Sequence, residues 1–188
     1  MKQAVIAIYM LITMSVMTGI MYPLAMTGIA QLLFSKQANG SLVTANGAIA
    51  GSELIGQGFA GPKYFHGRPS ANNYDGTNSG GSNLGPTNKK LIEQAEKQAI
   101  RVRMENGLPA GTSVPSDLVL ASGSGLDPHI GMESARIQVN RIAGERGIDK
   151  SIIIQLLALN SEKRYWWSGD LYVNVLKLNI ALDGLGKN

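Results

Sequence analysis

The feature that most constrains this chain is an uncharged N-terminal run. No charged residue lies between Lys2 and Lys36, and residues 4–34 are dominated by Ala, Val, Ile, Leu, Met and Gly. A helix needs about 20 apolar residues to cross ~30 Å of hydrocarbon, and residues 4–24 alone supply that length. Pro23 lies near the far end, where a kink is tolerated. The run predicts one membrane-spanning helix near residues 5–30, within an anchor of residues 1–35.

A cleaved secretory signal is the competing interpretation. Its apolar core is usually about 7–15 residues long and is followed closely by a small-x-small cleavage site. Residues 48–50 fit the cleavage pattern but lie well beyond the run, whereas residues 28–30 lie inside it. We therefore favour an uncleaved anchor. The positive N-terminus and Lys2 favour a cytoplasmic N-terminus, which leaves residues 36–188 outside the inner membrane.

Residues 36–188 are enough for one ordinary domain with a single core. The whole chain carries a formal charge of +4 and has no cysteine, which fits either compartment. Its basic residues are scattered, and most alternate with acidic ones on expected helix faces. No nucleic-acid partner is indicated.

The pattern along the domain predicts an α+β fold. Asn46-Gly47 between short apolar pairs indicates a hairpin in residues 37–50. Residues 56–86 contain too much Gly and Pro for a long regular element, so we expect them to wrap over the core and to bury aromatic side chains. Those aromatic residues are Phe59, Tyr64, Phe65 and Tyr74.

Helices are expected in four places. The first is capped by Thr87 or Asn88 and ends at Asn106-Gly107; the second covers residues 132–146 and stops at Gly147; the third follows Asp149. The fourth covers residues 175–182, after a strand-like alternation of Leu171 and Val173. The expected inward residues are Leu91, Ile92, Ala95, Ala99 and Val102 in the first helix, Ala135, Val139, Ile142 and Ala143 in the second, and Ile152, Ile153, Leu156 and Leu157 in the third.

Three loop segments, residues 64–71, 79–88 and 121–130, are rich in Gly, Ser, Asn and Pro, which suits shaped loops. Together they resemble the hallmark segments of the KdpC family, the C subunits of potassium-importing Kdp P-type ATPases. The resemblance continues into residues 51–57 and 173–183. The residues that carry it are Gly67, Arg68, Pro69, Ser79, Gly80, Gly81, Asn83, Gly85, Pro86, Thr87, Asn88, Ser122, Gly123, Ser124, Gly125, Asp127, Pro128, His129 and Asn174. Residues 160–170 depart from the family pattern.

The resemblance implies an accessory, non-catalytic subunit of the bacterial inner membrane. Its partners would be a channel-like A subunit, an ATP-hydrolysing B subunit and a small F subunit, alongside membrane lipid. ATP and potassium would be used by the complex, with no cofactor held by this chain. The family is described as a catalytic chaperone that raises the ATP affinity of the B subunit. For a domain outside the membrane, that effect would be indirect.

Two groups of residues could in principle carry chemistry themselves. The run Ser79, Gly80, Gly81 and Ser82 resembles the Ser-Gly-Gly signature of ABC transporters, whose backbone amides contact phosphate near a helix start. No Walker sequence accompanies it, so we favour a structural loop. Ser124, His129 and Asp127 hold the residue types of a serine hydrolase triad but lack the nucleophile elbow. We favour Asp127 as a turn or helix-start residue, with His129 hydrogen-bonded in the first turn.

The remaining candidates are weaker. His66 and His129 are the only histidines, and their spacing does not indicate a metal site. Arg68 could pair with another subunit or clamp its own loop, and we favour the clamp. The aromatic cluster at residues 165–167 suits either an interface or the core. Small residues of the anchor, Thr13, Ser15, Thr18, Gly19 and Thr27, suit helix packing in the membrane. The rival functions are a membrane-anchored periplasmic serine hydrolase and an anchored binding module unrelated to transport.

Overall fold

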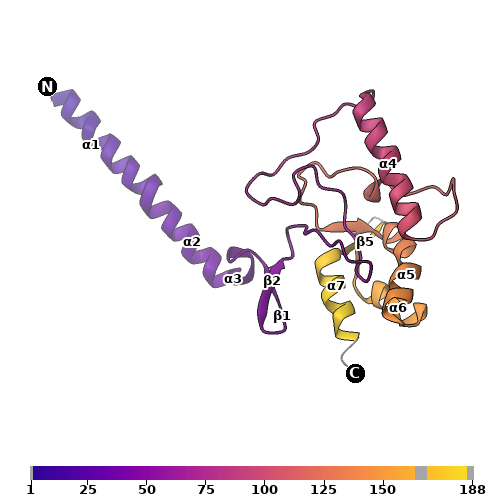
Figure 1. Ribbon diagram of the computed structural model, residues 1–188. Helices are drawn as coiled ribbons and strands as arrows, with labels where there is room; N and C mark the ends of the chain where they lie inside the picture. The colour runs from indigo at the N-terminus through magenta and orange to yellow at the C-terminus, as the bar shows by residue number, and fades with distance from the viewer. Residues whose placement is uncertain (1, 164–168, 186–188) are drawn as a thin grey trace. The chain divides into compact units, whose positions relative to one another are not determined.

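The computed structural model describes residues 2–163 and 169–185 (Figure 1). The chain divides after Leu42 into two compact units, each considered by itself. The first contains one long N-terminal helix, and the second is a mixed α/β domain. This is the fold class that the sequence predicts.

The first unit is an apolar helix in three sections. α1 (Lys2–Val16), the π-helical turn η1 (Met17–Met21) and α2 (Tyr22–Leu33) follow one another without a break. The π turn comes just before Pro23, which has no N–H to donate to a preceding carbonyl. The whole helix has 32 residues. Its most apolar 18-residue window has a mean hydropathy of 2.1, and none of that window is buried. It is long and apolar enough to cross a membrane.

The long helix ends in a tight elbow. Phe34 leaves the helical conformation, and the four-residue helix α3 (Ser35–Ala38) follows. The Asn39 side-chain amide donates to Gln31 Oε1 at 3.1 Å and to Ser35 O at 2.7 Å. The bond to Gln31 ties the chain after the elbow back to the last turns of α2, and the bond to Ser35 closes α3.

The expected hairpin, β1 (Leu42–Ala45) and β2 (Ala48–Ser52), follows α3. Asn46 and Gly47 have φ of 53° and 79°, as a type I′ turn requires. Residues 53–88 contain no helix or strand, which confirms the expected irregular segment. Phe65 from this segment is fully buried in the core.

The four expected helices are all present. They are α4 (Lys89–Glu105), α5 (Met132–Arg146), α6 (Lys150–Leu159) and α7 (Val175–Gly184). Asn88 caps α4 by accepting from Lys90 N at 2.9 Å, and Gly147 ends α5 with φ of 64°. Two expected core residues are wrong. Ile152 is 42% exposed, because only the Ile153 and Leu157 side of α6 is buried, and Ile92 is 46% exposed, because α4 buries only Val102.

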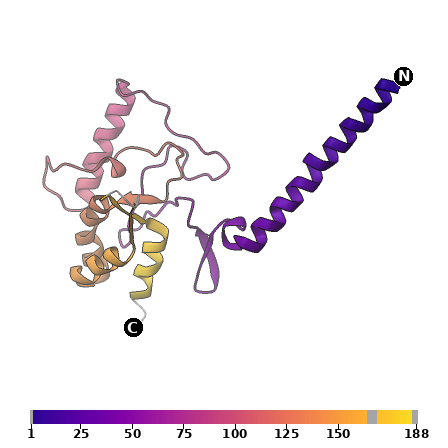
Figure 2. The same cartoon turned by 180° about the vertical axis from the view of Figure 1, so that it is seen from behind.

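Three short strands form an antiparallel sheet in the order β3-β5-β4. They are β3 (His129–Gly131), β4 (Ser161–Lys163) and β5 (Leu171–Asn174), with Ile130 opposite Val173. A 3-10 turn, η2 (Ser116–Leu118), precedes them. In both views α4 lies above the level of the sheet and α5, α6 and α7 lie below it (Figure 2).

The buried core lies on the α5–α7 side. Its cluster contains Phe65, Ile130, Ala135, Val139, Ile142, Ala143, Ile153, Leu157, Val173, Val175, Leu178 and Leu182. α4 contributes only Val102 to the buried residues. It is therefore the helix least held by the core, and it borders the loops that carry the family motifs.

Candidate functional site

The three motif loops lie against one another and form a single loop cluster, defined here as residues 67–72, 78–82 and 121–127. Arg68 Nη1 donates to Asp127 Oδ2 at 3.1 Å, joining the first loop to the third. Ser79 Oγ and Gly80 N both donate to Ser124 O, at 3.0 and 2.8 Å, which joins the second loop to the third. Arg68 thus pairs with a carboxylate of its own chain, on a neighbouring loop.

Two glycines allow these loops to approach so closely. Gly125 has φ of +69°, and a Cβ there would come within 2.7 Å of Gly80 O. A Cβ on Gly81 would lie 3.0 Å from Gly123 O. A side chain at either position would separate the loops, so glycine is needed for packing as well as for backbone conformation.

The possible phosphate loop uses its donors internally. The Ser79 hydroxyl and the Gly80 amide, the groups that would contact a phosphate, are bound to Ser124 O. A phosphate at this loop would have to replace bonds that hold the cluster together.

The possible catalytic triad is not assembled. Ser124 Oγ is exposed and accepts from Leu126 N at 3.1 Å. Asp127 Oδ1 accepts from His129 N at 3.0 Å and lies 3.6 Å from His129 Nδ1, while the His129 ring packs edge-on against Tyr172. Among the described residues, no hydrogen bond joins Ser124 to His129. Asp127 does not start a helix, because His129 begins strand β3. It is instead a turn residue, which was the other alternative that the sequence left open.

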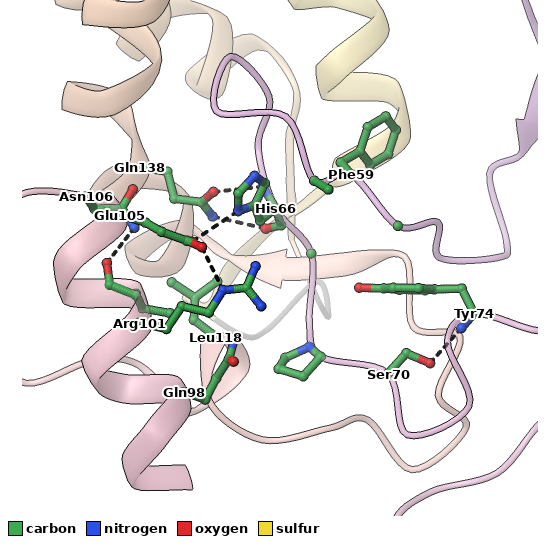
Figure 3. A pocket seen from close by; sticks show the side chains of 15 residues that line it. Phe59, His66, Ser70, Tyr74, Gln98, Arg101, Glu105, Asn106, Leu118 and Gln138 are labelled. Carbon is green, nitrogen blue, oxygen red and sulfur yellow. Dashed lines mark hydrogen bonds and ion pairs between the residues drawn. The ribbon is translucent and has the colours of Figure 1, made fainter. Parts of the chain in front are cut away.

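A cavity of about 410 Å³ lies beside the cluster, between α4 and residues 58–74 (Figure 3). On its α4 side, Glu105 accepts from Arg101 Nε at 2.6 Å and lies 3.5 Å from His66 Nδ1. Figure 3 shows these three side chains turned toward one another. The contact between Glu105 and His66 therefore connects α4 to the irregular segment across one wall of the cavity.

Two titratable groups are perturbed here. Burial, followed by the nearby Arg141 guanidinium, lowers the pKa of His66 below its ordinary value. Burial opposes ionisation of Asp127, but hydrogen bonds from His129 and Arg68 outweigh it and lower the pKa of that carboxyl. The structure thus favours a neutral His66 and an ionised Asp127 at neutral pH.

Sequence reasoning missed two buried amides that hold the irregular segment. Gln138 in α5 binds both backbone groups of His66, at 2.7 and 3.0 Å, and Asn179 in α7 binds both backbone groups of Phe65, at 2.8 and 3.0 Å. Both side chains are 1% exposed. The available signal was a polar residue at an inward helix position, between Ala135 and Ile142 in the case of Gln138.

Comparison with known proteins decides the family. Residues 4–184 match the family described as KdpC, K+-transporting ATPase, c chain. A potassium-transporting ATPase KdpC subunit of Koribacter versatilis is 45% identical over 187 residues, 97% of this chain and 95% of that protein. One of Mycobacterium bovis is 46% identical over 187 residues, 98% of this chain and 99% of that protein. The chain belongs to the KdpC family.

A further KdpC subunit, of Rhodospirillum rubrum, is 46% identical over 180 residues, 94% of this chain and 93% of that protein. The motif residues on which the resemblance was based converge in the loop cluster, apart from those that lead into α4 and Asn174. Asn174 caps α7 by accepting from Lys177 N at 3.1 Å and donates to Glu53 O at 2.7 Å. In this KdpC chain the motifs thus hold loops and helix ends in place.

Two further sequence features of this KdpC chain are its possible metal ligands and its aromatic cluster. Within the described residues there is no group of three or more His, Asp or Glu side chains that could hold a metal ion. The aromatic cluster at residues 165–167 lies outside the described residues, as do residues 164–168 of the segment 160–170 that departs from the family pattern.

Proposed function

We propose that this chain is the accessory C subunit of an ATP-driven potassium uptake complex, in which it stabilises the assembly of the A, B and F subunits. The observation that carries the proposal is the match to KdpC subunits along nearly the full length of both proteins. The chain holds no cofactor of its own in this role, and ATP and potassium are used by its partners.

The proposal includes a membrane topology. Residues 1–35 form a single-pass anchor in the bacterial inner membrane, with the N-terminus in the cytoplasm and residues 36–188 outside as one domain. The support is the 32-residue apolar helix at the N-terminus and Lys2 as its only charge before Lys36. Lipid therefore surrounds part of the anchor.

The subunit acts by binding and performs no chemistry. A domain outside the membrane does not meet cytoplasmic ATP, so a rise in the ATP affinity of the B subunit must come from preferential binding to one conformation of the pump. The loop cluster suits this role, because its internal hydrogen bonds give loops a fixed shape for docking. The internally bonded Ser124 and Ser79 hydroxyls support a non-catalytic subunit.

The test is to express the A, B and F subunits with and without this chain and to purify the complex through the A subunit. With the chain present, we expect a stable complex and potassium-stimulated ATPase activity with a KM for ATP lowered several-fold, the scale of common coupling energies. A complex that assembles equally well and has an unchanged KM without the chain would contradict the proposal.

The topology is tested separately. The chain has no cysteine, so Ile100→Cys provides a single reactive thiol on exposed α4. A membrane-impermeant maleimide should label it in intact spheroplasts. Labelling only after the membrane is broken would place the domain in the cytoplasm and reverse the proposed orientation.

A further inference from the structure

The hairpin after the long helix has an unusual surface. No charged residue lies between Lys36 and Glu53, a stretch that includes all of β1 and β2. The two-residue turn sets Thr44 opposite Ile49, so that Leu42, Thr44 and Ile49 share one face of the hairpin. Leu42 is 48% exposed and Ile49 is 66% exposed. We call these three residues the hairpin face.

The chain itself fixes how far this face can lie from the apolar helix. The elbow binds Asn39 to Gln31 in α2, and Ser41, which is 1% exposed, donates its N–H to Lys36 O at 2.9 Å. Leu42 belongs to the same compact unit as the helix. Since an extended chain spans at most about 3.6 Å per residue, Ile49 can be no more than about 25 Å from Leu42.

The helix end at the elbow is also apolar. Leu33 is 69% exposed and Phe34 is 57% exposed, with Lys36 as the nearest charge. Exposed apolar residues therefore lie on both sides of the polar elbow, at the last turn of α2 and at Leu42, the first residue of the hairpin face. Their exposure to water would be unfavourable, and a two-stranded hairpin alone is only marginally stable.

We propose that the hairpin face lies in the interfacial zone of the same lipid bilayer that holds the helix, with Leu42 and Ile49 directed toward the acyl chains. This inference rests on the proposed membrane anchoring. Lipid is the favoured occupant because only residues 34–41 separate the face from the end of α2, and because the face presents no charge that would have to lose its hydration. The backbone groups on the open strand edges, together with Thr44 and Asn46, keep the hairpin in the hydrated headgroup zone and out of the hydrocarbon core.

The exposed apolar residues of α4, in contrast, lie among charged residues. Ile100 and Met104 are 54% and 78% exposed, but Arg101, Arg103 and Glu105 lie among them. Ile100 therefore serves as a matched control: the same residue type, with similar exposure, in a charged environment and outside the proposed membrane contact.

The test uses the full chain, which is free of native cysteine, in vesicles of phosphatidylethanolamine and phosphatidylglycerol. Single variants Ile49→Cys, Ile100→Cys and Ile12→Cys each carry the same environment-sensitive fluorophore. Quenching is measured with a lipid that carries its quencher near the headgroup and with aqueous iodide. We expect the label at 49 to be quenched by the lipid at least several-fold more than the label at 100, and to be quenched correspondingly less by iodide.

Each outcome decides a different point. If the label at 12 is shielded from iodide and the label at 49 behaves like the one at 100, the hairpin inference is overturned and the anchor stands. If iodide quenches the label at 12 as strongly as the label at 100, the proposed anchoring fails. In the purified complex with the partner subunits, a label at 49 shielded from both quenchers would mean that a protein segment covers the face, which also overturns the inference. Leu42→Cys on the same face should repeat the Ile49→Cys result.

Discussion

Gln138 and Asn179 stabilise the irregular segment at the scale of single residues. Each binds both the N–H and the C=O of one backbone residue, as a neighbouring strand would. Buried backbone groups without partners are costly, and these amides let His66 and Phe65 enter the core without a sheet. Side chains thus replace regular structure where Gly and Pro are too frequent for it.

The close approach of the loops predicts a difference between two neighbouring glycines. Gly125→Ala should destabilise the domain by about 1–3 kcal/mol, because the methyl group would press on Gly80 O at a positive φ. Gly123→Ala, where nothing lies within 4 Å of the added Cβ, should change stability by less than about 0.5 kcal/mol. Denaturant unfolding of the full chain in detergent measures both, and equal losses would contradict the packing role of Gly125.

The lowered pKa of His66 predicts acid sensitivity. The unfolded chain binds a proton at His66 more readily than the folded one, so the contribution to stability is present above about pH 6.5 and is lost as pH falls toward the folded-state pKa. Burial and Arg141, with a smaller effect of Arg101, oppose protonation, whereas the Gly61 carbonyl and Glu105 favour it. Melting temperatures at pH 7.5 and 5.5 should fall more for the wild type than for His66→Gln. An identical fall would show that His66 does not titrate in this window.

Because no hydrogen bond joins Ser124 to His129 among the described residues, we expect the Ser124 hydroxyl and the His129 imidazole not to be catalytic. In the assembled complex, Ser124→Ala and His129→Ala should keep potassium-stimulated ATPase activity within a few-fold of wild type, with any loss following reduced folding. A folded and fully assembled His129→Ala complex that lost activity by about 10²-fold, the scale of acid–base catalysis, would revive an enzymatic role.

At the scale of elements, α4 differs from the other helices of the domain. It buries only Val102, whereas α5 buries six residues along its length. Its remaining attachments include the contact between Glu105 and His66 and a hydrogen bond from Arg103 Nε to Thr112 O at 2.8 Å. Helices with few buried contacts open at lower free energy than the core.

Hydrogen exchange should therefore separate the two helices. The amides of α4 should exchange faster than those of α5 in the full chain, since opening α4 exposes little apolar surface. Asn88→Ala should speed exchange further in the first turns of α4, because a lost cap costs about 1 kcal/mol. Thr87→Ala is the matched control, as the cap is Asn88. Equal protection of α4 and α5 would contradict this account.

At the scale of the whole molecule, two compact units share one chain, and under the proposed function each would offer the pump a separate surface. The helix presents apolar residues, with Thr18 and Gly19 in its π-helical turn, and the domain presents shaped loops. Joining them raises the effective concentration of the second contact to about the millimolar range once the first has formed.

Fragments should accordingly fail where the full chain succeeds. Residues 1–36 and residues 37–188, added separately to a complex of the other subunits, should each bind weakly and should not restore potassium-stimulated ATP hydrolysis at concentrations where the full chain does. If residues 37–188 alone restored activity completely, the anchor would serve only for localisation, and contacts through Thr18 and Gly19 would be ruled out.

The sequence by itself determined the local features. The apolar run, the Asn46-Gly47 turn, the Asn88 cap and the Gly147 stop depend on neighbouring residues only, and each lies where it was predicted. The family resemblance was also readable, because its motifs are contiguous in the chain.

Only the tertiary structure decided which distant residues meet. Three kinds of contact join segments that are far apart in the sequence. They are the ion pair of Arg68 with Asp127, the close approach of Gly80 to Gly125, and the hydrogen bonds from the Gln138 and Asn179 side chains to the backbone. The exposure of Ile152 and the shallow packing of α4 depend on what the rest of the chain places against each helix face. Periodicity identifies an apolar face, but burial requires a partner surface, and that surface exists only once the chain has folded.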